Sequence, residues 1–118
     1  MTKRSLLEFL QDILDAITEI ESFTNGLEFQ SFVKNREKIL AVVKLLEIIG
    51  EAVKKIPDEQ RVNYPEIHWK SVAGMKDILV HAYWNIDPVL VWATVQETLP
   101  LLKMVILDML SGLSGEAV

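Results

Sequence analysis

The chain has 118 residues and a formal net charge of −5, with 50% hydrophobic and 25% charged residues. This length fits one domain over residues 1–118, and the balance of apolar and charged residues excludes an intrinsically disordered chain. With no cysteine and two histidines, the sequence excludes disulfides and thiolate nucleophiles, and we expect no metal or cofactor. No signal peptide is apparent and Lys103 and Asp108 interrupt the apolar run 99–110, so we expect a cytoplasmic protein that spans no membrane.

The charges are unevenly distributed along the chain. Residues 34–76 contain nine basic and six acidic side chains, whereas residues 5–28 contain six acidic side chains and no basic one. The overall negative charge argues against indiscriminate binding of nucleic acid, but the basic middle can form a surface for an anionic ligand. Solvated helix faces explain the same distribution equally well, and the sequence alone leaves both interpretations open.

Apolar residues recur at steps of three and four in the first half of the chain, which predicts helices. The first helix is expected to begin with a capping box at Ser5–Glu8 and to stop at Asn25-Gly26. The second covers about residues 29–56, with an interruption near Asn35, and Pro57 is expected to end it. Its apolar face is wide enough to be central in a bundle or to be covered by a second subunit.

The second half of the chain predicts two further helices and no strand. After a linker at residues 57–65, a helix is expected over about residues 69–84. Asp87-Pro88 opens the last helix as N-cap and first helical residue, Pro100 should kink or split it, and residues 111–118 should form a frayed tail. The fold class is therefore all-α, an antiparallel bundle of four to five helices.

The predicted third helix carries the candidate chemistry. His81 projects away from its core stripe, and Asp77 lies four residues earlier on the same face. A carboxylate beside an imidazole suits a general base, although a surface ion pair is the commoner meaning of this spacing. Lys76 and Tyr83 lie together at an edge of the core stripe. Trp84 either marks a ligand or partner surface beside the polar pair or packs on the last helix.

Two further features have simpler explanations. Glu47 and Glu51 form a like-charge pair four residues apart, for which a neighbouring basic side chain such as Lys44, Lys54 or Lys55 is a sufficient explanation. His68 follows the linker without an identifiable partner, and we interpret it as a loop histidine without function.

Residues 74–83 read GMKDILVHAY and resemble the Gly-Met-Arg-Asn/Asp-x-Leu-x-His-x-Tyr signature of HepT-like proteins in the HEPN superfamily. Matching positions on both sides, including residues 49–52, 64–69 and 86–87, extend the resemblance over about residues 45–102. The resemblance implies a helical bundle that forms a homodimer with its motif at a cleft between protomers. It also implies a metal-independent ribonuclease toxin of a toxin–antitoxin module, partnered by an MNT-type nucleotidyltransferase antitoxin.

The resemblance also implies roles for individual residues. His81 would be the general base that takes a proton from an RNA 2′-hydroxyl, Asp77 would orient it, and Tyr83 matches the tyrosine that the antitoxin modifies with AMP. Lys76 stands where the family has an arginine that contacts the scissile phosphate, and lysine lacks the planar fork of that group. RNA is thus the expected substrate, with neither DNA nor a membrane as partner. The alternative is a non-catalytic helical dimer that binds a nucleotidyltransferase.

Overall fold

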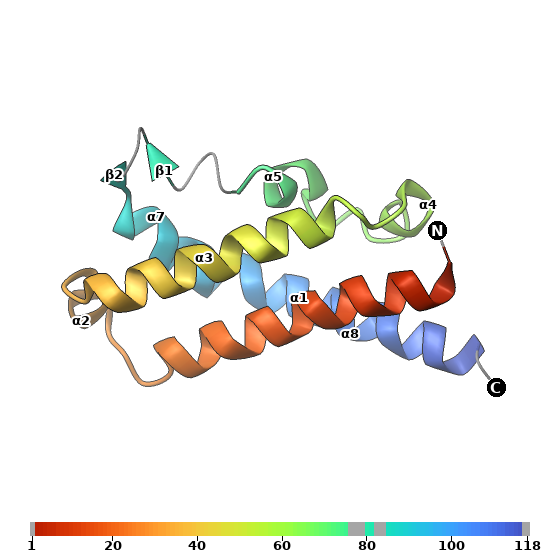
Figure 1. The fold of residues 1–118 in the computed structure, drawn as a ribbon, viewed down its shortest axis with the longest axis horizontal. Helices are drawn as coiled ribbons and strands as arrows, with labels where there is room; N and C mark the ends of the chain where they lie inside the picture. Colours follow the sequence, from red (N-terminus) through yellow and green to blue (C-terminus); the bar gives the residue numbers. More distant parts are fainter. Residues whose placement is uncertain (1, 76–79, 82–84, 117–118) are drawn as a thin grey trace.

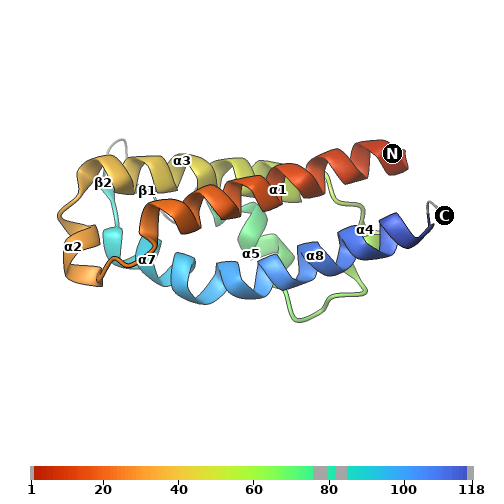
Figure 2. The ribbon, with the colours of Figure 1, turned by 90° about the horizontal axis from the view of Figure 1, so that it is seen from below.

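The computed structural model describes residues 2–75, 80–81 and 85–116. It confirms an all-α fold (Figure 1). The strands in these ranges form one short pair, and each of its strands has two residues. Helix α1 lies beside both α3 and α8, and runs antiparallel to each of them (Figure 2). The short helices α2 and α5 pack against α3, and the C-terminal helical run also contacts it through α7. The elements are α1 (Lys3–Thr24), α2 (Phe29–Val33), α3 (Arg36–Val53), α4 (Asp58–Arg61), α5 (Trp69–Ala73), β1 (Val80–His81), β2 (Asn85–Ile86), α7 (Pro88–Ala93), the π turn η1 (Thr94–Thr98) and α8 (Leu99–Glu116).

The core lies where the apolar faces of α1, α3 and α8 meet. Each helix contributes side chains spaced by three or four residues, as the periodicity predicts for one buried face. Fully buried members of this set are Leu10, Ile13, Ile17, Ile20, Val42, Leu46, Ile49, Leu102 and Ile106. At one end of the bundle, the Phe32 ring of α2 lies 5.2 Å from the Trp92 ring of α7, centroid to centroid, which joins the two short helices.

Helix α1 begins before the expected capping box. Thr2 is the N-cap, and its Oγ1 accepts a hydrogen bond from the Ser5 backbone N–H at 3.1 Å. The prediction of a Ser5–Glu8 capping box was therefore wrong, because Thr2 already supplies the acceptor and Glu8 instead pairs with Arg4 at 3.5 Å. The predicted end is confirmed, since Asn25 is the C-cap and Gly26 has φ +75°, in the left-handed region that favours glycine.

The interruption predicted near Asn35 is confirmed. Asn35 is the N-cap of α3, with its Oδ1 accepting from the Lys38 backbone N–H at 3.1 Å. At its other end α3 stops at Val53, earlier than expected, because Arg61 donates to the carbonyl oxygens of Val53 at 2.8 Å and Ile56 at 2.9 Å. Pro57 consequently serves as the N-cap of α4 within the predicted linker, and does not itself end α3.

The continuous helix expected over residues 69–84 was wrong. Helix α5 ends at Ala73, with Gly74 as its C-cap, and Val80–His81 form a strand that pairs antiparallel with Asn85–Ile86. Gly74 weakens a helix at this point. Val80 and Ile86 favour extended backbone, and the N–H and C=O groups of that backbone find partners across the strand pair. This pairing places β2 directly before the Asp87 N-cap of α7.

The last helix starts as predicted. The Asp87 carboxylate accepts from the backbone N–H groups of Val89 at 3.0 Å and Leu90 at 3.2 Å, with Pro88 at the first helical position. The disruption expected at Pro100 takes the form of the π turn η1 just before it, in which the Leu99 N–H bonds to the Thr94 carbonyl. Such a turn gives room for the proline ring, which would otherwise clash with a carbonyl one turn back.

The C-terminal helix is longer and more apolar than expected. Helix α8 continues to Glu116, through the segment expected to be a frayed tail, and the Leu113 side chain is buried. The run Pro88–Leu113 is long and apolar enough to cross a membrane, with a mean hydropathy of 1.4, but 39% of its apolar 18-residue stretch is buried in the protein. Core helices of bundles commonly meet the same criterion, so this is weak support for a membrane span.

Candidate functional site

The motif segment lies between α5 and β2. Lys76, Asp77 and Tyr83 lie outside the described residues, as does Trp84, and for His81 the structure describes only the backbone, which lies in β1. The elements that hold the two ends of the segment frame the candidate site. The predicted roles of these side chains stay predictions.

The first end of the motif is held against α3. A Cβ atom at Gly50 would lie 3.2 Å from the carbonyl oxygens of both Val72 and Ala73, so a glycine in α3 lets the end of α5 approach closely. The side chains of Val72 and Met75 are buried on either side of this contact. The backbone that leads into Lys76 is consequently fixed on the middle of the bundle.

The second end of the motif is held by the strand pair. His81 pairs with Asn85 and Val80 with Ile86, and Ile86 packs partly buried against the core. Because β2 leads directly into the capped start of α7, the backbone position of His81 is tied to the C-terminal helical run. The described ends of the motif segment are thus attached to α3 and, through β2, to α7, two helices that also contact each other.

The linker before α5 is ordered by long side chains. The Trp69 indole N–H lies 3.1 Å from the carbonyl oxygens of both Arg61 and Tyr64. The Tyr64 hydroxyl donates to the Asp108 carboxylate of α8 at 2.6 Å, and this bond, with partial burial, raises the pKa of Tyr64 to about 12. Sequence reasoning missed this bond because its partners are 44 residues apart and neither lies in a local motif.

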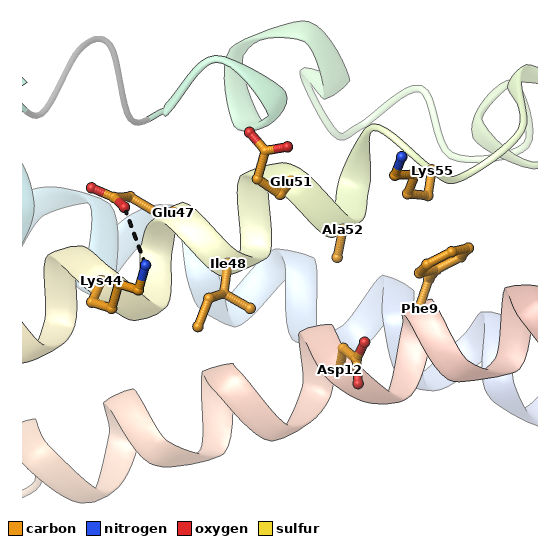
Figure 3. A pocket seen from close by; sticks show the side chains of 8 residues that line it. All are labelled: Phe9, Asp12, Lys44, Glu47, Ile48, Glu51, Ala52 and Lys55. Carbon is orange, nitrogen blue, oxygen red and sulfur yellow. Dashed lines mark ion pairs between the residues drawn. The ribbon is translucent and has the colours of Figure 1, made fainter.

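A hollow of about 470 Å³ lies between α1 and α3 (Figure 3). Glu47 pairs with Lys44 at 3.9 Å and Glu51 pairs with Lys54 at 3.1 Å, which confirms that neighbouring lysines accompany this carboxylate pair. The residues that line the hollow are Phe9, Asp12, Lys44, Glu47, Ile48, Glu51, Ala52 and Lys55. Its carboxylates outnumber its lysines, so it is not the basic surface that the charge distribution allowed.

A second cavity, of about 430 Å³, lies between α5 and the π turn, and we call it the α5/η1 cavity. Met75, directly before the motif lysine, forms part of its wall, and His68, interpreted from the sequence as having no function, lies on its rim. Sequence reasoning missed this cavity because its lining comes from two separate stretches of the chain, residues 66–75 and 90–101. The residues that line it are Glu66, Ile67, His68, Ser71, Val72, Met75, Leu90, Thr94, Glu97, Thr98 and Leu101.

The described part of the chain contains no group of three or more histidine, aspartate or glutamate side chains placed to hold a metal ion. A helical bundle that carries a GMKDILVHAY segment fits the class of HEPN-type proteins. A model of the ribonuclease HepT-like family matches residues 13–109, and the chain belongs to this family.

Two relatives illustrate matches along nearly the whole of both chains. The Methanocaldococcus jannaschii protein named “Putative RNase MJ1216” is 40% identical over 116 residues, which cover 98% of this chain and 96% of the relative. A Thermococcus cleftensis protein named “Probable ribonuclease HepT” is 45% identical over 101 residues, covering 86% and 92% of the two chains. No solved structure matches the chain.

Proposed function

We propose that this protein is a cytoplasmic ribonuclease that cleaves RNA by attack of a 2′-hydroxyl on the adjacent phosphate, without a metal ion. The observation that carries the proposal is the GMKDILVHAY segment in a chain that belongs to the HepT-like ribonuclease family. The relatives named as ribonucleases support the same substrate class. The anchoring of both ends of this segment by α3 and α7 suits a site whose groups must be held in fixed positions.

The reaction assigns one task to each motif side chain. His81 takes the proton of the 2′-hydroxyl, and the resulting oxygen nucleophile forms a bond to phosphorus while the bond to the 5′-oxygen breaks. Protonated His81 then returns a proton to the leaving 5′-oxygen, so that the product is a 2′,3′-cyclic phosphate and a free 5′-hydroxyl. Asp77 orients the imidazole, and Lys76 balances the charge that builds up on the phosphoryl oxygens.

The proposal includes a homodimer and a regulatory partner. Three apolar side chains on α8 support a second subunit, since Leu101 is 40% exposed, Met104 68% and Leu107 45%. A nucleotidyltransferase antitoxin that adds AMP to Tyr83 would place a bulky anion beside the phosphate-binding Lys76, and so block RNA.

Cleavage of RNA by the purified protein, in the presence of a metal chelator, tests the proposal. We expect products that end in 2′,3′-cyclic phosphate, and we expect His81→Ala to abolish them while the exposed loop variant Asn63→Ala cleaves normally. Cleavage that survives His81→Ala, or that stops with the chelator, would contradict this mechanism.

A specific observation favours a second candidate, a non-catalytic helical dimer that binds a nucleotidyltransferase. Lysine at position 76 retains the positive charge but not the two parallel hydrogen bonds that arginine makes with a phosphate. If neither the native chain nor Lys76→Arg cleaves RNA, while the native chain forms a stable complex with a nucleotidyltransferase, this second function is the correct one.

A further inference from the structure

The α5/η1 cavity has an apolar floor and a polar rim. Ile67, Val72 and Met75 are buried beneath it, with exposed fractions of 6%, 4% and 5%, and Leu90 and Leu101 close its sides. Its volume of about 430 Å³ falls within the range of about 300–1,000 Å³ that is typical of small-molecule sites. Apolar walls with a few polar groups at the edge are the usual construction of a site that holds a flat ring.

The charges at the rim determine what can enter. No lysine or arginine is among the described residues that line the cavity, whereas Glu66 and Glu97 both lie on it. A phosphate group would therefore be repelled, and a neutral group that donates hydrogen bonds would be favoured. Among the described residues, none forms a hydrogen bond or ion pair with the Glu97 side chain, which is exposed.

The π turn presents Thr94, Glu97 and Thr98 to the cavity. Thr94 Oγ1 donates to the Leu90 carbonyl at 2.8 Å, which fixes the hydroxyl and leaves its oxygen free to accept a hydrogen bond. A π turn is a local departure from regular helix that often occurs at functional sites. Here it places acceptor groups side by side above an apolar floor.

The cavity also adjoins the motif. Met75 forms part of its wall and is the residue directly before Lys76, which the proposed reaction places at the phosphate. An RNA strand with its phosphate at the motif would therefore have a neighbouring base close to this cavity.

We propose that the α5/η1 cavity is a nucleobase subsite for the RNA substrate, and that it selects cytosine or adenine, which carry an amino group at C4 or C6 of the ring, over uracil, which carries a carbonyl oxygen at C4. The base lies between the apolar walls, and its amino group donates a hydrogen bond to the Glu97 carboxylate, a pairing known for carboxylates and cytosine. This inference rests on the proposed ribonuclease function, and it adds to that function the choice of base.

Binding of short RNA to a non-cleaving His81→Ala protein tests the subsite separately from catalysis. The probes are fluorescent oligomers of cytidine and of uridine with equal length. Their bases differ on one edge of the ring, where cytosine has an amino group on C4 and an acceptor at N3, and uracil has a carbonyl oxygen on C4 and an N3–H donor. We expect the cytidine oligomer to bind about fivefold more tightly, which corresponds to one hydrogen bond to a charged acceptor on a partly exposed rim.

The variant Glu97→Gln should remove most of this preference, since an amide can present either a donor or an acceptor to the ring. The matched control is Glu19→Gln on the exposed face of α1, which should retain it. Equal binding of the two oligomers by the protein with Glu97 intact, or the same loss of preference in both variants, would overturn the subsite.

Two further results keep this inference distinct from its alternatives. If the native protein cleaves RNA and Glu97→Gln leaves the bases at the cut sites unchanged, the subsite is wrong and the ribonuclease stands. If the cytidine preference is present and depends on Glu97, but the native protein with His81 intact does not cleave RNA, the subsite stands and the proposed ribonuclease function is wrong. A lower particle mass for Glu97→Gln by light scattering, with unchanged base preference, would show that a second copy covers the cavity and would overturn the proposal.

Discussion

Tyr64 and Asp108 are 44 residues apart in the sequence, yet the tyrosine hydroxyl lies 2.6 Å from the aspartate carboxylate. This hydrogen bond joins the linker before α5 to the middle of α8, two parts of the chain that meet in the folded protein. Because Trp69 also donates to the Tyr64 carbonyl, the same residue connects α8 to the start of α5. The start of α5, the helix that precedes the motif, is thus connected to α8 through Tyr64.

Removing this bond should weaken the whole fold. We expect Tyr64→Phe to lower the free energy of unfolding by about 1 kcal/mol. A hydrogen bond to a charged acceptor usually contributes more, but this site is partly exposed to water, which weakens the interaction. Urea unfolding measures the change, with the midpoint lowered and the slope constant. In a double-mutant cycle with Asp108→Ala, the second change should cost little once the first is made, and full additivity of the two would contradict a shared bond.

The same bond predicts a loss of stability at high pH. The pKa of Tyr64 is raised from 10.0 to about 12, so the hydroxyl keeps its proton in the folded state over a range in which the unfolded chain loses it. The unfolded state then binds fewer protons, and the stability that Tyr64 contributes is complete below pH 10 and is lost as the pH rises toward about 12. Unfolding free energies of the native chain and Tyr64→Phe should therefore converge over this interval. A constant difference between them would contradict the raised pKa.

The close approach of Gly50 to α5 predicts that two glycine-to-alanine substitutions change the stability of the protein in opposite directions. Alanine is favoured over glycine within a helix by about 1 kcal/mol, so Gly112→Ala, which meets nothing within 4 Å, should stabilise α8 by up to that amount. At Gly50 the new Cβ would meet two backbone carbonyl oxygens at 3.2 Å, and the resulting shift of α5 should cost more than the helix gains. Thermal unfolding of both variants distinguishes them, and equal stabilisation would show that α5 is not held closely at this point.

Local chemistry predicted much of the fold. The capping roles of Asp87 and Gly26, and an interruption near Asn35, were predicted from the sequence because they depend on side chains and backbone within four residues. The start of α1 was misplaced because Thr2 and Ser5 both carry a hydroxyl able to cap, and the sequence does not decide between them.

The errors at the candidate site have a different cause. The break at Gly74 and the strand at Val80–His81 depend on α3 and on Asn85–Ile86, neither of which the periodicity of residues 69–84 reveals. The α5/η1 cavity was likewise not foreseen, because its walls are assembled by packing. The motif itself could be found from sequence alone, since its spacing is local.

The lysine of the motif allows a test in which activity is gained. If Lys76 contacts the scissile phosphate as a single point charge, Lys76→Arg should raise the rate of RNA cleavage by about tenfold, because a planar guanidinium forms two parallel hydrogen bonds to the phosphoryl oxygens. Expression in a bacterial host gives the corresponding growth measurement. We expect Lys76→Arg to inhibit growth more strongly than the native chain, and Lys76→Arg combined with His81→Ala to have no effect. The control is Lys70→Arg, an exposed change on α5 that should behave like the native chain. If Lys76 contacts the phosphate, only Lys76→Arg should increase growth inhibition. Equal growth with Lys76→Arg and Lys70→Arg would therefore mean that the charge at position 76 does not act on the phosphate.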